Sequence, residues 1–163
     1  MYKFELKDFP NPPFSIKHVD LSLSFFDTYV EGSEVLTIRA PEALTSSIIF
    51  DAQDLTITGA EISTTKAFSK SQPLTFLYNK KENKLELFFP TPIGNNSTFY
   101  IKIDATCRPT DNILEGLYFD VAPEGAPPQI ISQCQQWGFQ RIMPFIDDCR
   151  AKCTWRTTIE ASS

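Results

Sequence analysis

The segment His18-Val19-Asp20-Leu21-Ser22-Leu23-Ser24-Phe25 alternates polar and apolar side chains without interruption. In an extended chain, successive side chains point to opposite sides, so Val19, Leu21, Leu23 and Phe25 share one face. The pattern predicts a β-strand in a sheet that has one buried face and one face in water. No segment of the chain sustains an apolar period of about 3.6 residues over several turns. We therefore predict an all-β fold.

Similar alternating segments recur along the chain, separated by residues that favour turns. Gly32 and Ser33 predict a turn into a second strand at 35–39, which ends before Pro41 because proline cannot donate to a strand ladder. Further strands are predicted at 47–51, 55–58, 74–78, 84–89, 99–106 and 152–160. The segments 108–112 and 122–128 resemble loops, with Leu117-Tyr118-Phe119 between them. This spacing is typical of a broad, mainly antiparallel sheet or sandwich.

Composition predicts one folded domain over 1–163. The chain has 163 residues, of which 42% are hydrophobic, and this is enough apolar material for a core without disulfides. Its net charge is −5 and its cations are scattered, which argues against nucleic acid as a partner. No apolar run approaches the roughly 18 residues that a membrane span needs, and the first residues lack the apolar core of a signal peptide. We expect a cytoplasmic protein that does not bind membranes.

Few residues offer catalytic or metal-binding chemistry. The only histidine, His18, shares the polar face of its predicted strand with Asp20, and a surface pair is the simpler interpretation than a hydrolytic triad. The adjacent acids Asp147 and Asp148 are expected to cap a turn or to pair with Arg150 or Lys152.

The four cysteines are expected to be reduced thiols. Cys149 and Cys153 have the spacing of half a metal site, but a closed zinc site needs four ligands, and neither Cys107 nor Cys134 supplies a matching pair. No metal site is therefore predicted in this chain.

Adjacent aromatic pairs at 25–26 and 88–89 cannot both face a core, because neighbouring side chains on a strand point to opposite sides. We expect Phe26 or Phe88 to be exposed on a surface that another domain covers. Trp137 and Phe139 add further aromatic surface near the C-terminal loops.

Two motifs carry a resemblance to a known family. They are Asn112-Ile113-Leu114-Glu115-Gly116-Leu117-Tyr118 and the stretch Gln133-Cys134-Gln135-Gln136-Trp137-Gly138-Phe139-Gln140-Arg141-Ile142-Met143-Pro144-Phe145-Ile146-Asp147. Together with 14–21 and 50–57, in the same order, they resemble the N-terminal domain of the aminopeptidase N family of zinc (gluzincin) metallopeptidases. The L-E-G-L-Y element is most similar to the bacterial alanyl aminopeptidase branch. The chain departs from the family at Cys149, where many relatives have proline.

The resemblance implies a fold, a partner and a role for two residues. The family's N-terminal domain is a saddle-shaped, mainly antiparallel β structure beside a thermolysin-like catalytic domain. Its Q-C-E or Q-C-Q loop helps to hold the free α-amino group of a peptide substrate, and Gln135 and Gln133 match the residues of that loop. An amide oxygen can accept a hydrogen bond from an ammonium group. The alternative for both glutamines is that their side chains cap the backbone of the loop.

The same resemblance implies that catalysis occurs elsewhere. The chain contains neither G-A-M-E-N nor H-E-x-x-H, so the one zinc ion of the family is expected in the catalytic domain, which this chain lacks. By itself the chain is predicted to be inactive. The rival hypothesis is a free-standing β-sandwich that binds a protein or a glycan through the loops between 119 and 137.

Overall fold

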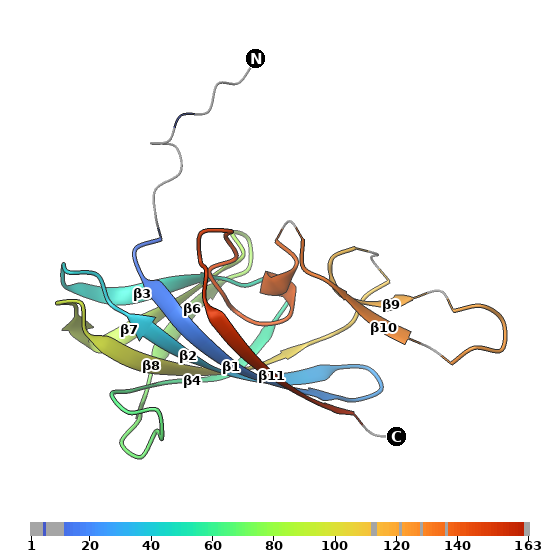
Figure 1. Cartoon of the computed structure of the whole chain (residues 1–163), viewed down its shortest axis with the longest axis horizontal. Coiled ribbons are helices and arrows are strands. Elements are labelled where there is room, and N and C mark those ends of the chain that lie inside the picture. The colour runs from blue at the N-terminus through green and yellow to red at the C-terminus, as the bar shows by residue number, and fades with distance from the viewer. Residues whose placement is uncertain are drawn as a thin grey trace.

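The computed structural model describes residues 5, 12–111, 114–120, 122–127, 129–135 and 137–161. The described residues form three β-sheets and one short 3-10 helix, and all strand pairs except one are antiparallel. The large sheet has the order β11 (Thr154–Ala161), β1 (Ser15–Phe25), β2 (Val30–Arg39), β8 (Thr98–Cys107), β4 (Thr56–Ser63) and β5 (Gln72–Pro73). The all-β prediction is confirmed (Figure 1).

Two smaller sheets complete the described fold. The first has the order β3 (Thr45–Asp51), β7 (Lys84–Ile93) and β6 (Thr75–Asn79), and the second pairs β9 (Gly116–Asp120) with β10 (Gln129–Gln133). The 3-10 helix η2 spans Phe139–Arg141. The β9 and β10 hairpin extends from the end of the molecule opposite the turn that joins β7 to β8 (Figure 1). Sequence reasoning placed loops around β10, so this strand was missed.

One apolar core joins the large sheet to the three-stranded sheet. Alternate residues of β2 and β8 are buried, as are the alternate residues Leu85, Leu87 and Phe89 of β7. Phe89 meets Phe99 edge to face, with 5.6 Å between the ring centroids. The alternating apolar pattern of β1 therefore predicted its buried face correctly, since Val19, Leu21 and Leu23 all belong to this core.

The predicted turn at Gly32 and Ser33 is wrong. Both residues lie inside β2, and the chain turns at 26–29, where Phe26 N donates to Tyr29 O over 3.0 Å and the two rings stack. Gly32 faces the core, and a Cβ there would overlap the sulfur of Met143. The glycine therefore serves close packing in a strand rather than a turn.

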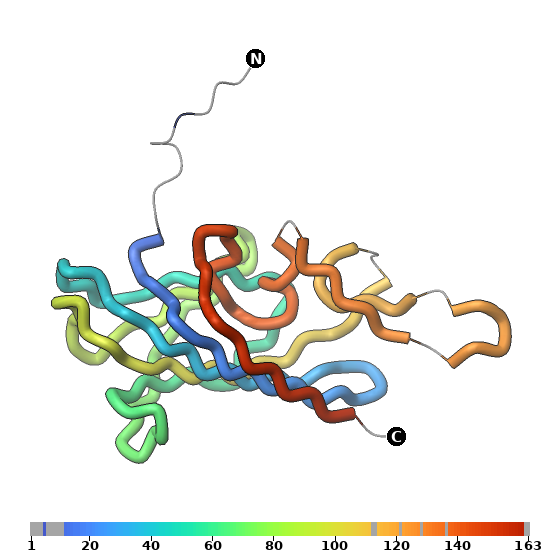
Figure 2. Tube along the Cα trace, viewed as in Figure 1, coloured from blue at the N-terminus to red at the C-terminus, as the bar shows by residue number. Residues whose placement is uncertain are grey.

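The last strand is also arranged differently from the rest. β11 pairs in parallel with β1, with His18 opposite Thr154, so the first and the last strand lie side by side in the large sheet (Figure 2). All eight residues of β11 are exposed, including Trp155 and Ile159.

Phe26 and Phe88 are both exposed as well, whereas Phe89 is buried. The described part of the chain has no helix that is long and apolar enough to cross a membrane.

Glu34 is an exception inside the core. It faces inward between Gly32 and Leu36 and is completely buried. Neither carboxylate oxygen has a hydrogen-bond partner among the described residues. Burial raises the pKa of the Glu34 carboxyl well above its ordinary value, because the charged form loses its hydration.

Candidate functional site

The loop that carries Gln133 and Gln135 begins at the end of β10. Gln133 is the last residue of that strand and lies opposite Gly116 of β9. The chain then folds back so that Gly138 N donates to Cys134 O over 3.3 Å. A Cβ at Gly138 would overlap Gln133 O and lie 2.9 Å from Cys134 Cα. The tight return of the chain therefore requires glycine at 138.

The side chains of the two predicted site residues are available for contacts. Gln133 is half-buried and Gln135 is exposed. Within the described part of the chain, neither amide makes a hydrogen bond in the structure, so the alternative that they cap the loop backbone gains no support. The amides are presented by a backbone whose path is held on both sides of the loop.

Arg141 connects three segments that are far apart in the sequence. Its Nη1 lies 2.6 Å from Asp54 Oδ2, in the connection between β3 and β4. Its Nη2 lies 2.7 Å from Glu115 Oε2, just before β9. Its backbone N–H donates to Gly138 O over 3.2 Å. The planar guanidinium of Arg141 thus binds two carboxylates at once.

Gly116 allows the two motifs of the sequence to touch. Its φ angle is +69°, and a Cβ there would lie 2.8 Å from Arg141 Cβ and 3.3 Å from Gly138 O. Both the backbone conformation and the lack of space favour glycine. The loop that carries Gln133 and Gln135 is called here the glutamine loop. It and the L-E-G-L-Y element therefore form one structural unit.

Asp147 and Asp51 attach this unit to the three-stranded sheet. Asp147 Oδ2 accepts from Gln140 N over 3.1 Å, and Asp147 N donates to Asp51 Oδ2 over 3.0 Å. Asp51 also pairs with Lys84 and exchanges two backbone hydrogen bonds with Phe145. Partial burial raises the pKa of Asp147, and the nearby negative charge of Asp51 acts in the same direction.

The neighbouring acid has a different environment. Asp148 forms an ion pair with Arg150, and the hydrogen bonds from this side chain lower the pKa of Asp148 to about 2. Asp148 Oδ1 also accepts from Arg150 N, and Asp148 O accepts from Ala151 N. These bonds form the turn that contains Cys149. The expected turn-capping and salt-bridging role is confirmed for Asp148. Among the described residues Asp147 pairs with neither Arg150 nor Lys152, and it accepts from Gln140 N instead.

His18 lies in a surface cluster. Its Nε2 is 3.4 Å from Asp20, and its Nδ1 is 2.7 Å from the hydroxyl of Thr154. Lys66 also reaches Asp20, at 2.6 Å, and its hydrogen bond lowers the pKa of that carboxyl. The predicted pairing of His18 and Asp20 on the polar face is confirmed.

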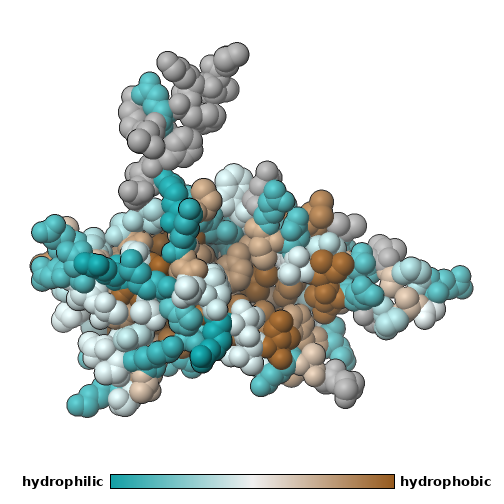
Figure 3. All heavy atoms as spheres, viewed as in Figure 1, coloured by the Kyte–Doolittle hydropathy of each residue, from teal (hydrophilic) through white to brown (hydrophobic). Residues whose placement is uncertain are grey.

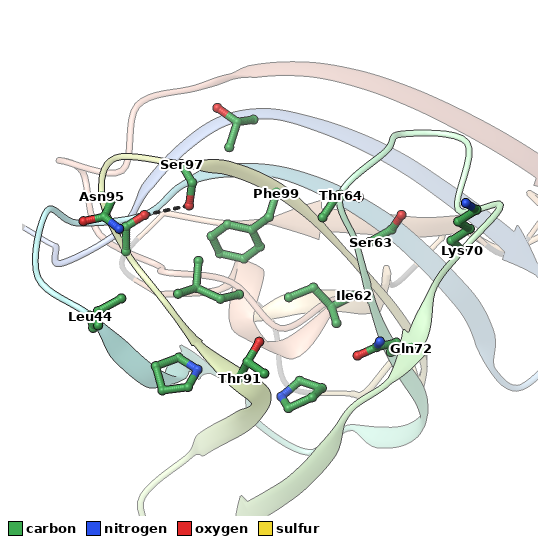
Figure 4. Close-up of a pocket in the computed structure, with 15 residues that line it drawn as sticks. Leu44, Ile62, Ser63, Thr64, Lys70, Gln72, Thr91, Asn95, Ser97 and Phe99 are labelled. Atoms are coloured by element: carbon green, nitrogen blue, oxygen red, sulfur yellow. Dashed lines mark hydrogen bonds between the residues drawn. The ribbon is translucent and has the colours of Figure 1, made fainter.

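Two described cavities differ in their relation to the glutamine loop. One, of about 390 Å³, borders the loop and is lined by residues that include Trp137, Ile146 and Asp147. The other, of about 520 Å³, surrounds Phe99 and Ile62, with Ser63, Gln72 and Lys70 at its rim (Figure 4). It lies at the end of the large sheet away from the β9 and β10 hairpin, so it takes no part in the candidate site.

No group of three or more potential metal ligands is present in the described residues. All four cysteines are free thiols. The residues that the structure describes therefore do not fit a zinc ion. Within them, the candidate site consists of the side-chain amides of Gln133 and Gln135 on the loop that follows β10.

Sequence reasoning singled out Gln133 and Gln135 but missed the residues that hold them. Arg141 and Glu115 stand in two separate motifs with opposite charges, and this was the available signal for their pairing. The glycines at 116 and 138 were the signal for a close approach of backbones.

Comparison with known proteins gives one family. The chain matches the family model for the Peptidase M1 N-terminal domain over residues 14–163. No curated protein matches the chain.

Proposed function

This chain belongs to the family of peptidase M1 N-terminal domains, and from that premise we propose a specific role for it. It is the non-catalytic N-terminal domain of a zinc-dependent aminopeptidase that removes N-terminal residues from peptides. It walls one side of the active site, and Gln135, with Gln133, helps to anchor the free α-amino group of the substrate. The L-E-G-L-Y and Q-C-Q elements support a parent enzyme near the bacterial alanyl aminopeptidase branch.

The observation that carries this proposal is the state of the Gln135 side chain. It is exposed, and it makes no hydrogen bond within the described residues. Its backbone neighbours are held by Gly138, Arg141 and the β9 and β10 ladder. An amide oxygen held in this way can accept a hydrogen bond from a substrate ammonium group, and a site built for that bond selects against blocked N-termini.

Exposed apolar residues near the loop support a neighbouring domain. They are Leu114, Ile130, Trp137, Trp155 and Ile159. On the face shown in Figure 3, apolar atoms gather between the centre of the molecule and the base of the β9 and β10 hairpin, beside β11, while both ends are mainly hydrophilic. Such surfaces typically mark contacts with another domain or protein. The proposed occupant is the catalytic domain of the same polypeptide, whose residues would hold the zinc ion.

The test is substitution of Gln135 in the full-length enzyme. Gln135→Ala removes the acceptor, and hydrogen bonds to charged groups contribute about 1.5 to 3 kcal/mol, so we expect kcat/KM for free-amine peptides to fall about tenfold or more, mainly through KM. Gln135→Glu adds a negative charge and is expected to lower KM.

Gln129→Ala is the matched control, because Gln129 is an exposed glutamine at the other end of β10. Its kinetics should be unchanged. An unaltered kcat/KM in Gln135→Ala would remove this residue from the substrate site.

A further inference from the structure

We propose that Arg141 is a positioning residue for the glutamine loop, and that it acts through its simultaneous ion pairs with Asp54 and Glu115. The inference deepens the proposed function and rests on it for its consequence in catalysis. The three residues are called here the arginine clamp.

The first attachment is to the loop itself. Arg141 follows Gly138 by three residues and donates its backbone N–H to Gly138 O. Gly138 in turn has no room to move toward Gln133, because even a Cβ would overlap Gln133 O. A displacement of Arg141 is therefore passed to the backbone on which Gln133 and Gln135 are carried.

The second attachment is to Asp54. This residue has a φ angle of +56°, and the segment around it is bonded on both sides. Ala52 N donates to Asn83 O over 2.9 Å, and Leu55 N donates to the hydroxyl of Tyr78 over 3.2 Å. Asp54 is thus a fixed point on the body of the domain.

The third attachment is to Glu115, which precedes the tight contact of Gly116 with Arg141. The guanidinium therefore lies between a fixed carboxylate on the domain body and a carboxylate on the β9 and β10 hairpin. Arginine suits this position because its planar group presents several donors in a fixed geometry, whereas lysine offers a single charged centre.

The arginine clamp fixes the position of the glutamine loop more than it stabilises the fold. The Arg141 side chain is 21% exposed, but Asp54 is 70% exposed and Glu115 is 47% exposed. Ion pairs as open as these usually add less than about 1 kcal/mol to folding. Without the guanidinium, two carboxylates would face each other across the junction, and their repulsion would move the hairpin away from the domain body.

The first experiment tests the clamp in the present chain and does not depend on enzymatic activity. The chain has two tryptophans, so Trp155→Phe leaves Trp137, inside the loop, as the only reporter. In this background Arg141→Met is expected to lower the fluorescence anisotropy of Trp137 and to increase its quenching by acrylamide. Arg141→Lys should give an intermediate value. Arg156→Met is the matched control, since Arg156 lies on β11 and is 78% exposed.

Adding Glu115→Gln to Arg141→Met distinguishes displacement of the loop by carboxylate repulsion from a simple loss of the Arg141 contacts. It removes the repulsion between the carboxylates, and we expect it to restore part of the Trp137 anisotropy. Circular dichroism verifies that each variant is folded. If Arg141→Met does not fold, the single variant Glu115→Gln replaces it in the fluorescence measurement. Unchanged Trp137 signals in folded Arg141→Met, or in folded Glu115→Gln where that variant replaces it, would overturn the clamp.

The second experiment uses the full-length enzyme. Arg141→Met should raise KM for free-amine peptides several-fold while kcat changes much less, and the double variant with Glu115→Gln should recover part of the loss. A changed Trp137 signal with an unchanged KM would support the clamp and contradict the role proposed for the loop. An unchanged Trp137 signal would contradict the clamp whatever the kinetics.

Discussion

The centre of the large sheet and the segment 133–148 are held together in different ways. In β2 and β8, alternate side chains pack in one shared core. Another amino acid of similar size and polarity can replace most of them with a moderate loss of stability. In 133–148, the path of the chain depends on single residues, including Gly138, Arg141 and Asp147. A repeated pattern specifies the first region, whereas individual contacts specify the second.

This difference separates the two tasks of the domain. The sheets contain most of the buried apolar surface and therefore most of the stability. The segment 133–148 presents polar side chains at a surface and needs an accurate backbone position more than a large core. Substitutions in the two regions should therefore affect different measurements.

The largest expected effect is in the core. Ile48 is 1% exposed and its neighbour Ile49 is 53% exposed, so the two residues form a matched pair on β3. Ile48→Ala should lower the free energy of unfolding by about 2 to 5 kcal/mol, because it removes buried methyl groups and leaves a cavity. Ile49→Ala should change it by less than about 0.5 kcal/mol. Urea unfolding measures both, and equal losses would contradict the burial of this strand.

Gly138→Ala tests the second region directly. The new Cβ would overlap backbone atoms of Gln133, so we expect a loss of roughly 1 to 3 kcal/mol and a displaced loop. Gly59→Ala is the control, since its Cβ would only reach ordinary contact, 3.7 Å from Asp104 Oδ2. Urea unfolding and Trp137 fluorescence in both variants provide the comparison. A Gly138→Ala protein with native stability and an unchanged Trp137 signal would show that the loop tolerates another path.

Glu34 interrupts the apolar pattern of the core and makes its stability depend on pH. Because its pKa is raised in the folded state, the folded chain binds a proton that the unfolded chain releases above its ordinary pKa of 4.5. The parent chain should therefore lose stability as the pH rises above that value. Glu34→Gln removes this loss, and at pH 7 it should be more stable than the parent by roughly 1 to 3 kcal/mol.

Urea unfolding of both proteins at pH 4 and pH 7 measures the effect of Glu34. The stability difference between variant and parent should be larger at the higher pH. A difference of the same size at both values would mean that folding does not raise the pKa of Glu34.

The smallest effect is expected at the surface cluster of His18, Asp20 and Lys66. Because its pKa is lowered on folding, Asp20 contributes stability above its ordinary value of 3.8, and this contribution is lost as the pH falls through the folded value. At pH 7, Asp20→Asn should cost less than about 1 kcal/mol. Thermal unfolding at neutral and acidic pH, with Lys66→Met and the double variant, measures the coupling. A cost that persists at low pH would show that packing, and not charge, is involved.

Alternation was sufficient to predict the buried face of β1. It was insufficient for Gly32, because glycine occurs both in turns and where another side chain approaches a strand, and here Met143 approaches from a distant segment. It also missed β10, whose residues pair with β9 but are mostly exposed, so that no apolar alternation marks the strand.

For the candidate site, the two glutamines came from the resemblance between motifs, and their role in substrate binding stays a proposal. The residues that hold them were not predicted. Arg141 interacts with partners 87 and 26 positions earlier in the chain, and a single sequence does not specify which opposite charges meet.

Strand periodicity and contiguous motifs are local properties, so the amino-acid sequence was enough to predict the fold class, the buried face of β1 and the family. Three features depend on the folded structure: the parallel pairing of β11 with β1, the burial of Glu34 with no hydrogen-bond partner among the described residues, and the joining of the L-E-G-L-Y element to the glutamine loop through Arg141. Each of these depends on segments that meet only when the chain is folded. The physical reason is that electrostatic and packing contacts act over a few ångströms in space, whatever the separation along the chain.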